Sequence, residues 1–423
     1  MSYTVTKTTS WFERLGKSFS GIIVGMVLFV GATVLLWWNE GNFVKTQVAL
    51  KEAQTVTQEL ENISKVDSSL NGQLVHATGR AETEDILDDP VFGISINAIR
   101  LERTVEYFQW VEDKRTETRQ KLGGGEEKVT TYFYSQKWVH SPVDSLQFAA
   151  PGASGQYKNF VFIKLDDFTV QATNVTFGAY RLPKFLIDLI RIPESFSVEL
   201  SDDVMTKLNE QLAPWLPSSS LPAPTSTPLL PLDLQDNTDA VGGATAIQNQ
   251  WVHVNDNTIY IGLSPSSPQT ADTRITFKRT LPATVSLIAK LNGDTLESYV
   301  AKNGRTVGLL SVGTHSAENM YESAHTANAL LTWILRLLGI ILVCIGLSLI
   351  TAPLSVLASV VPFLGKLVGA GTGIVCVLLG LAWSLLVIAV AWLFYRPLVA
   401  IVLLVAVVVL IALLYRRGQS TIR

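Results

Sequence analysis

Four stretches of the chain are long, apolar and almost free of charge. They cover residues 21–38, 330–350, 369–394 and 398–414, and Arg336 is the only fully charged residue within them. A run of roughly 18 apolar residues is long enough to cross a hydrocarbon core of about 30 Å as a helix. The pattern therefore predicts an integral membrane protein with four transmembrane helices, one near the N-terminus and three near the C-terminus.

The last two runs are separated only by Tyr395, Arg396 and Pro397. A proline ends a helix, and the polar residues beside it favour a turn at the membrane surface, so the two runs should form an antiparallel hairpin.

The long segment between the first and second runs is polar and changes its periodicity along its length. Residues 43–66 and 315–329 show helical spacing, and we expect Ser316 to cap the second of these helices. Residues 104–112 and 128–138 are dense in Val, Tyr, Phe, Trp and Thr, and a Gly123–Gly125 turn between them predicts a long hairpin. Further strands are expected at residues 159–165, 169–177, 251–254, 258–263, 274–279, 284–290 and 306–312, and short helices at 182–190 and 200–212. The predicted fold is a β-rich α+β extramembrane domain inserted between spans 1 and 2.

A segment rich in proline and serine divides this domain. Residues 214–231 carry six of the 17 prolines, a composition typical of an extended linker or insertion. We therefore expect a first β-rich lobe over residues 39–213, a linker over 214–239, and a second lobe with the return helix over 240–329. Residues 351–368, between the second and third spans, should form a cytoplasmic interfacial loop.

The N-terminal 20 residues predict a cytoplasmic amphipathic helix. Ser10 and Glu13 form a capping box, and Trp11 belongs to an apolar face interleaved with basic residues. The run at 21–38 lacks a small-residue cleavage site after it, which makes it a signal anchor. Basic residues before this run and in the tail at 415–423 place both termini in the cytoplasm and send the β-rich domain into the periplasm of a bacterium or the lumen of a eukaryote.

Aromatic residues at the ends of the runs fit this orientation, because Trp and Tyr prefer the membrane interface. The expected interface anchors are Trp11, Trp37, Trp38, Trp333, Trp392 and Tyr395.

Three charged residues lie at or near the membrane boundaries: Glu40, Arg336 and Arg396. A charge there is costly unless it is paired or reaches the headgroups. Our hypothesis is that Glu40 pairs with Arg336 or Arg396 and locks span 1 against the C-terminal hairpin. The alternative is that each side chain extends separately to the headgroups.

Glycines supply a second packing signal. Gly21 and Gly25, and also Gly365 and Gly369, have the G-x-x-x-G spacing that lets two helices approach closely in lipid. The alternative is chance occurrence in a glycine-rich membrane sequence.

Charge and chemistry exclude several classes of protein. A net charge of −3 argues against a nucleic-acid binder, and both cysteines lie in apolar runs, which argues against a disulfide framework. No hydrolase, zinc-protease or dinucleotide motif occurs. Glu322 and His325 have a metal-ligand spacing, but a second such helix is missing, so a solvated helix face explains them better. We predict no enzyme activity, no cofactor and no metal site.

Several motifs then resemble one family. They are Trp38-Asn39-Glu40-Gly41, residues 72–76 (GQLVH), Asp89-Pro90 with Phe92-Gly93, residues 101–112 (LERTVEYFQWVE), Gly293-Asp294, residues 313–321 (GTHSAENMY), Thr332-Trp333 with Arg336, and residues 392–398 (WLFYRPL). Their order and the four-span layout are similar to those of the transmembrane protein 43 (LUMA) family, and more closely to its bacterial members. The proline-rich segment departs from the family pattern.

This resemblance implies a scaffolding role without catalysis. Eukaryotic members of the family are placed in the endoplasmic reticulum and inner nuclear membrane, where they self-associate and bind other envelope proteins. We expect a homo-oligomeric scaffold that organises a membrane protein complex, in the bacterial inner membrane with a periplasmic domain. The alternative is an accessory binding or transport protein whose external domain captures lipid, envelope polymer or a small ligand.

Overall fold

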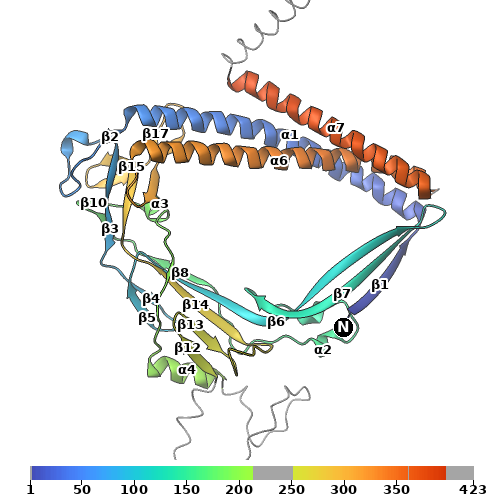
Figure 1. Ribbon diagram of the computed structural model, residues 1–423, viewed down its shortest axis with the longest axis horizontal. Helices are drawn as coiled ribbons and strands as arrows, with labels where there is room; N and C mark the ends of the chain where they lie inside the picture. Colours follow the sequence, from blue (N-terminus) through green and yellow to red (C-terminus); the bar gives the residue numbers. More distant parts are fainter. Residues whose placement is uncertain (1, 213–250, 361, 397–423) are drawn as a thin grey trace, which may run out of the picture.

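The computed structural model describes residues 2–212, 251–360 and 362–396 (Figure 1). The predicted linker at 214–239, the fourth predicted span at 398–414 and the tail at 415–423 lie outside the described residues.

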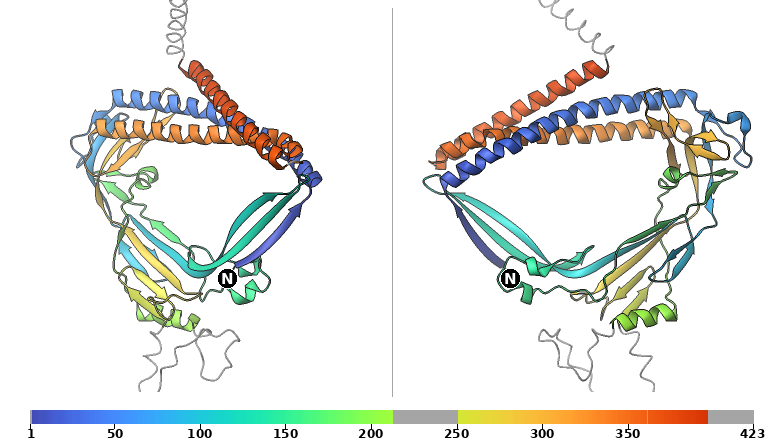
Figure 2. Two further views of the ribbon diagram at one scale, coloured as in Figure 1. Left: turned by 45° about the vertical axis from the view of Figure 1, so that its right-hand side comes forward. Right: turned by 180° about the vertical axis from the view of Figure 1, so that it is seen from behind.

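Three long apolar helices carry the membrane part of the chain. They are α1 (Trp11–Val56), α6 (Ala317–Ala358) and α7 (Pro362–Tyr395), and each contains a stretch long and apolar enough to cross a membrane. The predicted runs at 21–38, 330–350 and 369–394 lie within these helices. In both views of Figure 2, α1 and α6 run side by side for most of their length and α7 crosses them at an angle.

The helix starts follow the predicted caps. Ser10 Oγ accepts a hydrogen bond from the backbone N–H of Glu13, and Ser316 Oγ accepts one from that of Asn319. Each cap satisfies a backbone donor that the first helical turn leaves free.

Both α1 and α6 are longer than the sequence suggested. α1 includes residues 11–20 of the predicted amphipathic helix and continues through most of the predicted helix at 43–66. It ends at Val56. α6 continues through Pro353 to Ala358, and α7 begins at Pro362, so the expected loop at 351–368 is mostly helical. A proline removes one backbone donor only, and helices in apolar surroundings tolerate that loss when their other backbone groups stay paired.

The β-rich domain lies between α1 and α6 in the sequence and contains two large sheets. The first has the order β1-β7-β6-β14-β13-β12, with β8 also on β6 and β11 on β14. Its strands are β1 (Ser2–Thr9), β6 (Arg100–Gln120), β7 (Glu126–Val139), β8 (Phe168–Gln171), β11 (Glu194–Ser195), β12 (Val252–Asn255), β13 (Thr258–Ile261) and β14 (Thr273–Thr280).

The second sheet has the order β19-β15-β16-β10-β9-β3-β2, and β15 also pairs with β3. Its strands are β2 (Gln58–Glu59), β3 (Leu74–Thr83), β9 (Val175–Phe177), β10 (Tyr180–Arg181), β15 (Ala283–Asn292), β16 (Thr295–Glu297) and β19 (Leu309–Val312). Two small pairs complete the strands: β4 (Ile86–Asp89) with β5 (Ile94–Asn97), and β17 (Tyr299–Val300) with β18 (Thr306–Val307). The short helices are α2 (Ala153–Gln156), α3 (Lys184–Ile187) and α4 (Asp202–Leu212), with 3-10 turns at Ser68–Leu70 and Ser145–Gln147.

Strands from before and after the proline-rich segment pair in both sheets. β14 pairs with β6, and β15 pairs with β3 along eight residue pairs. One apolar core, with Leu101, Phe177, Phe277 and Leu287 among its buried members, spans both halves of the sequence. The described residues therefore form one interleaved domain and not the two successive lobes that the linker suggested.

The predicted strand at 159–165 is irregular in the structure. Asn159 lies beside β6 but is held by its side chain: Nδ2 donates to the carbonyl of Trp110, and Oδ1 accepts from the N–H of Trp110. An amide that bonds a neighbouring backbone in this way takes the place of a ladder pair.

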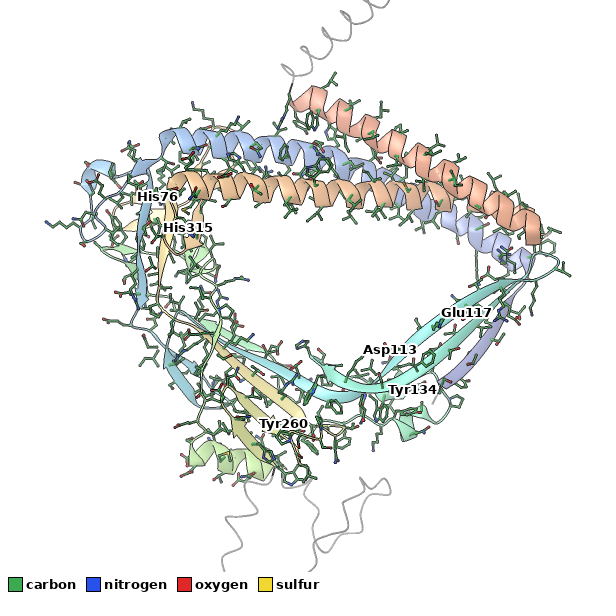
Figure 3. All side chains as sticks on the ribbon, in the orientation of Figure 1. His76, Asp113, Glu117, Tyr134, Tyr260 and His315 are labelled. Atoms are coloured by element: carbon green, nitrogen blue, oxygen red, sulfur yellow. The ribbon has the colours of Figure 1, made fainter. Side chains whose placement is uncertain are left out.

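The predicted hairpin is present and extends far beyond the rest of the sheet. β6 and β7 pair from Tyr107 with Val139 to Gln120 with Glu126, and β1 adds to β7 from Ser2 with Phe133 to Thr9 with Glu126. We call residues 2–9, 112–120 and 126–134 the arm. Asp113 and Glu117 are on it, on the lower right of the molecule (Figure 3).

The tip of the arm contacts the far ends of α1 and α6. Arg14 binds Glu126 at 3.1 Å and donates to the carbonyl of Gly124, while the N–H of Gly123 donates to Val360 O at 3.2 Å. Gly124 has a φ of +80°, and a Cβ there would collide with the Trp11 ring, so this turn needs glycine. The helices, the domain and the arm therefore form a closed frame (Figures 1 and 2).

This arrangement corrects the prediction for residues 1–20. Residues 2–9 are a strand and not part of an amphipathic helix, because alternating Thr with Tyr3 and Val5 suits the edge of β7. The arm carries charged side chains on both faces, for example Asp113, Lys114 and Arg115, so it belongs in water. In this structure β1 shares the aqueous compartment of the arm, whereas the sequence placed a bilayer between residues 1–20 and the domain.

Candidate functional site

A buried ion pair joins α1 to α6 where both helices are apolar. Arg336 Nε lies 2.6 Å from Glu40 Oε1, and Arg336 Nη2 lies 2.7 Å from Glu40 Oε2. Glu40 is completely buried, and the Arg336 side chain is 10% exposed. This two-point geometry is the strongest arrangement that arginine and a carboxylate can adopt.

The third helix contributes a neutral donor. The indole Nε1 of Trp392, on α7, donates to Glu40 Oε2 at 2.6 Å. The Arg336 guanidinium lies over the rings of Trp333 and Trp392, at 4.7 and 5.8 Å from the ring centres. Both oxygens of Glu40 are therefore hydrogen-bonded, and the charge of Arg336 is shared between a carboxylate and two aromatic faces. We call Glu40, Arg336 and Trp392 the three-helix lock.

The residues on either side of Glu40 bring the helices close enough for this contact. Asn39 Nδ2 donates to the carbonyl of Thr332 at 3.1 Å, which fixes α1 against α6. A Cβ at Gly41 would lie 2.5 Å from Cζ of Tyr395, so a larger residue here would displace the Tyr395 ring.

The energetic consequence is asymmetric. Removing two charges from water costs several kcal/mol, and their mutual attraction offsets this only when the geometry is good and the remaining lone pairs are satisfied. Removal of one partner leaves a buried unpaired charge, which typically costs about 3–5 kcal/mol. Any arrangement of the three helices that separates Glu40 from Arg336 is therefore strongly disfavoured.

The sequence left two partners open for Glu40, and the structure places Arg336 there. Arg396 lies instead over the rings of Phe43 and Trp392, at 5.3 and 5.1 Å. Trp392 was expected only as an interface anchor. Its position five residues before Pro397 gave no indication that its indole would reach a carboxylate on α1.

The glycines differ in their roles. A Cβ at Gly25 would lie 2.7 Å from the carbonyl oxygen of Gly346, so this pair sets the closest approach of α1 and α6. Gly21 has only the Leu349 carbonyl at 4.0 Å, and Gly369 has only Ser355 Cβ at 3.8 Å. Gly365 lies in α7, but its surroundings are outside the described part of the chain.

Three further glycines make close contacts that no spacing motif revealed. Besides Gly346, they are Gly339, where a Cβ would lie 2.6 Å from Leu36, and Gly380, where it would lie 2.6 Å from Cys344 Sγ.

The aromatic anchors divide into two groups. Trp38 and Trp333 are exposed, at 54% and 65%, as expected of side chains at the lipid or interface. Trp37 packs against Phe394 and Tyr395 inside the helix bundle, and Trp11 Nε1 donates to the carbonyl of Val356 at 2.9 Å.

Beyond the lock, α1 and α6 continue as a pair into the domain. Thr57 and Tyr321 share a hydrogen bond of 2.7 Å, Glu52 accepts from the Tyr299 hydroxyl at 2.8 Å, and Asn328 donates to the carbonyl of Phe43 at 3.2 Å. His76 on β3 faces acceptors with both ring nitrogens: the Glu59 carboxylate at 2.8 Å and the carbonyl of His315 at 2.9 Å (Figure 3). The helix pair is thus built into the second sheet.

This site holds the three helices together. Glu40 and Arg336 neutralise one another and are shielded from solvent. In residues 2–212, 251–360 and 362–396, no three His, Cys, Asp or Glu side chains gather as they would around a metal ion.

Taken together, three long apolar helices joined by a buried ion pair, with a β-rich domain inserted between the first and second, define a class of multi-pass membrane protein. A sequence profile described as "Transmembrane protein 43" matches residues 107–397. The chain belongs to the transmembrane protein 43 family.

Individual relatives match over almost the whole length. The chain is 29% identical to transmembrane protein 43 of Homo sapiens over 417 residues, which cover 98% of this chain and 94% of the human protein. It is 30% identical to the Rattus norvegicus protein, over 93% of this chain and 89% of the relative, and 25% identical to the Drosophila melanogaster homologue, over 93% and 94%. No solved structure matches the chain.

Proposed function

We propose that this protein is a non-enzymatic scaffold that organises a membrane protein complex through self-association. The observation that carries the proposal is the three-helix lock, which makes α1, α6 and α7 one unit. A buried ion pair that fixes which helices meet, and in which register, suits a protein whose task is to hold a shape.

Continuity between the membrane helices and the domain supports the same role. The α1 and α6 pair runs without a break from the lock into the second sheet, where Tyr321 and Met320 are buried beside Leu50, Ala53 and Ile288. A partner bound to the domain is therefore positioned rigidly relative to the bilayer.

The finer membrane arrangement is also part of the proposal. We propose a bacterial-type member located in the inner membrane with its domain in the periplasm, in which residues 398–414 form a further span after α7. The apolar run at 398–414 and the resemblance to bacterial members support these assignments.

Self-association is tested by purifying two differently tagged copies from the same cells. Capture of one tag from detergent extracts should recover the other at a stoichiometric level. Mixing of separately expressed extracts after solubilisation is the control for aggregation. Recovery of one tag alone would reject the scaffold in this form.

A second candidate function is ligand capture by the external domain. The observation that favours it is a pocket of about 430 Å³ on the first sheet.

A further inference from the structure

We propose that the pocket on β12, β13 and β14 is a binding site for a neutral saccharide. The pocket is half open, and its volume of about 430 Å³ lies in the range of small-molecule sites. It is lined by Trp138, His253, Asn255, Asp256, Asn257, Thr258, Tyr260, Pro265, Pro268 and Arg274. This inference goes beyond the scaffold role and is independent of it.

The strand register builds the floor of the pocket. His253 pairs with Tyr260, Tyr260 with Arg274, and Arg274 with Glu106, so these side chains form one row on one face across four strands. The Arg274 guanidinium lies 4.4 Å from the centre of the Trp138 ring, and Trp138 in turn meets the edge of Tyr260. The wall is therefore an edge-to-face pair of aromatic rings with the Arg274 guanidinium over one of them.

The polar side chains that line the pocket leave both hydrogen-bond donors and hydrogen-bond acceptors available to a ligand. Arg274 Nε and Nη2 are used by Glu106, at 2.9 and 2.6 Å, and Nη1 has no partner among the described residues. His253 Nε2 donates to the carbonyl of Gly262 at 3.1 Å, which leaves Nδ1 available. The Asn255 amide is exposed and has no hydrogen bond within the described chain. Hydroxyl groups, which donate and accept, match this mixture.

Charge argues against an anionic ligand, and polarity argues against a lipid. The positive charge of Arg274 is already matched by Glu106, and Asp256 adds a negative one, so the pocket has no surplus positive charge for a phosphate or carboxylate. A lipid tail would leave the Arg274, His253 and asparagine groups without water or partners. A neutral polyhydroxylated ring that lies beside Trp138 and Arg274 meets both conditions.

The loop that closes the pocket is held in a strained conformation. Ala271 has a φ of +83°, which is rare for a residue with a side chain, and it is buried. The next residue, Asp272, accepts hydrogen bonds from the Tyr260 hydroxyl and from the N–H of Gln269, which fixes Tyr260 and the loop together. A Cβ at Gly262 would collide with the Asp272 carboxylate. The Ala271 conformation, the Asp272 hydrogen bonds and the Gly262 contact thus all fix the shape of the loop, and the pocket stays open.

The test uses the full chain in a detergent without a sugar headgroup, because glycoside detergents would compete. Maltotriose, cellotriose and tri-N-acetylchitotriose are titrated by calorimetry and by tryptophan fluorescence. Asn255→Ala removes an exposed amide with no partner in the described chain, so the fold should survive. Gln73→Ala, which removes an exposed amide in the bend just before β3, is the matched control.

We expect saturable binding of at least one neutral trisaccharide. Asn255→Ala should weaken it about fivefold, the equivalent of one neutral hydrogen bond, and Gln73→Ala should leave it unchanged. Absence of saturable binding with all three sugars, equal weakening by both variants, or tighter binding of trigalacturonate than of any neutral sugar would each overturn the proposal.

Discussion

Glu40 and Arg336 are 296 positions apart in the sequence, and their side chains meet at 2.6 Å inside the helix bundle. Neither charge reaches solvent to any great extent, so each depends on the other and on the indole of Trp392. This relationship gives the most direct prediction about the membrane part of the protein.

Replacing Glu40 by Gln should destabilise the helix bundle by about 3 kcal/mol, because Arg336 would remain buried without a counter-charge. Thermal or denaturant unfolding in detergent measures the loss. Arg396→Gln is the control: among the described residues the Arg396 guanidinium contacts only the rings of Phe43 and Trp392, and its loss should cost about 1 kcal/mol or less.

Removing both charges distinguishes the contribution of the ion pair to stability from that of side-chain packing. The double variant Glu40→Leu with Arg336→Met should recover most of the stability lost in Glu40→Gln, because no unpaired charge remains. A double variant as unstable as the sum of its single variants would show that the two residues do not interact.

Replacing Gly25 by Ala should separate α1 from α6. The added Cβ would lie 2.7 Å from the backbone oxygen of Gly346, which cannot move without shifting a helix, so we expect a loss of about 1–3 kcal/mol. Gly31→Ala is the matched control on the same helix, since nothing lies within 4 Å of its added Cβ. Equal melting temperatures for the two variants would contradict the close contact.

Asp272 predicts a dependence of domain stability on pH. Burial raises the pKa of its carboxyl from 3.8 to about 6, in spite of the hydrogen bonds from Tyr260 and Gln269 that favour its charged form. Between these two values the unfolded chain holds fewer protons than the folded one, so stability should fall as pH rises from about 4 to about 6.

The variant Asp272→Asn isolates this contribution, because an amide does not titrate there. The difference in melting temperature between the wild type and Asp272→Asn should change steadily over the same pH interval and be constant above it. A difference that is the same at every pH would show that Asp272 has an ordinary pKa.

The pairing of β1 with β7 predicts the compartment of the N-terminus. Single cysteines at Thr4, at Leu122 on the arm tip and at Gln73 in the domain should all react with an impermeant reagent from the same side of the membrane. Reaction of Thr4→Cys only from the cytosol and of Gln73→Cys only from the other side would restore the arrangement expected from the basic residues.

Local patterns were sufficient to predict the elements that depend on neighbouring residues. The first three apolar runs lie in α1, α6 and α7, Ser10 and Ser316 cap their helices, and the Gly123–Gly125 turn joins β6 to β7. Each of these features is decided by residues within a few positions of one another.

Features that depend on distant residues could not be predicted in the same way. β14 pairs with β6 across the proline-rich segment, and β1 pairs with β7 across the whole of α1, yet no local signal specifies either partner. The donor from Trp392 and the glycine contacts at Gly339 and Gly380 depend on how α7 crosses the other helices. The three-helix lock was predicted only in part. A buried Glu40 requires a cationic partner, but the sequence left both Arg336 and Arg396 possible.

The particle mass in native lipid tests the scaffold most directly. The chain has a mass of 46.3 kDa, and self-association predicts a defined multiple of it for the protein extracted with its surrounding bilayer. A uniform population of single chains, under conditions where the helix bundle remains folded, would contradict self-association and with it the proposed role.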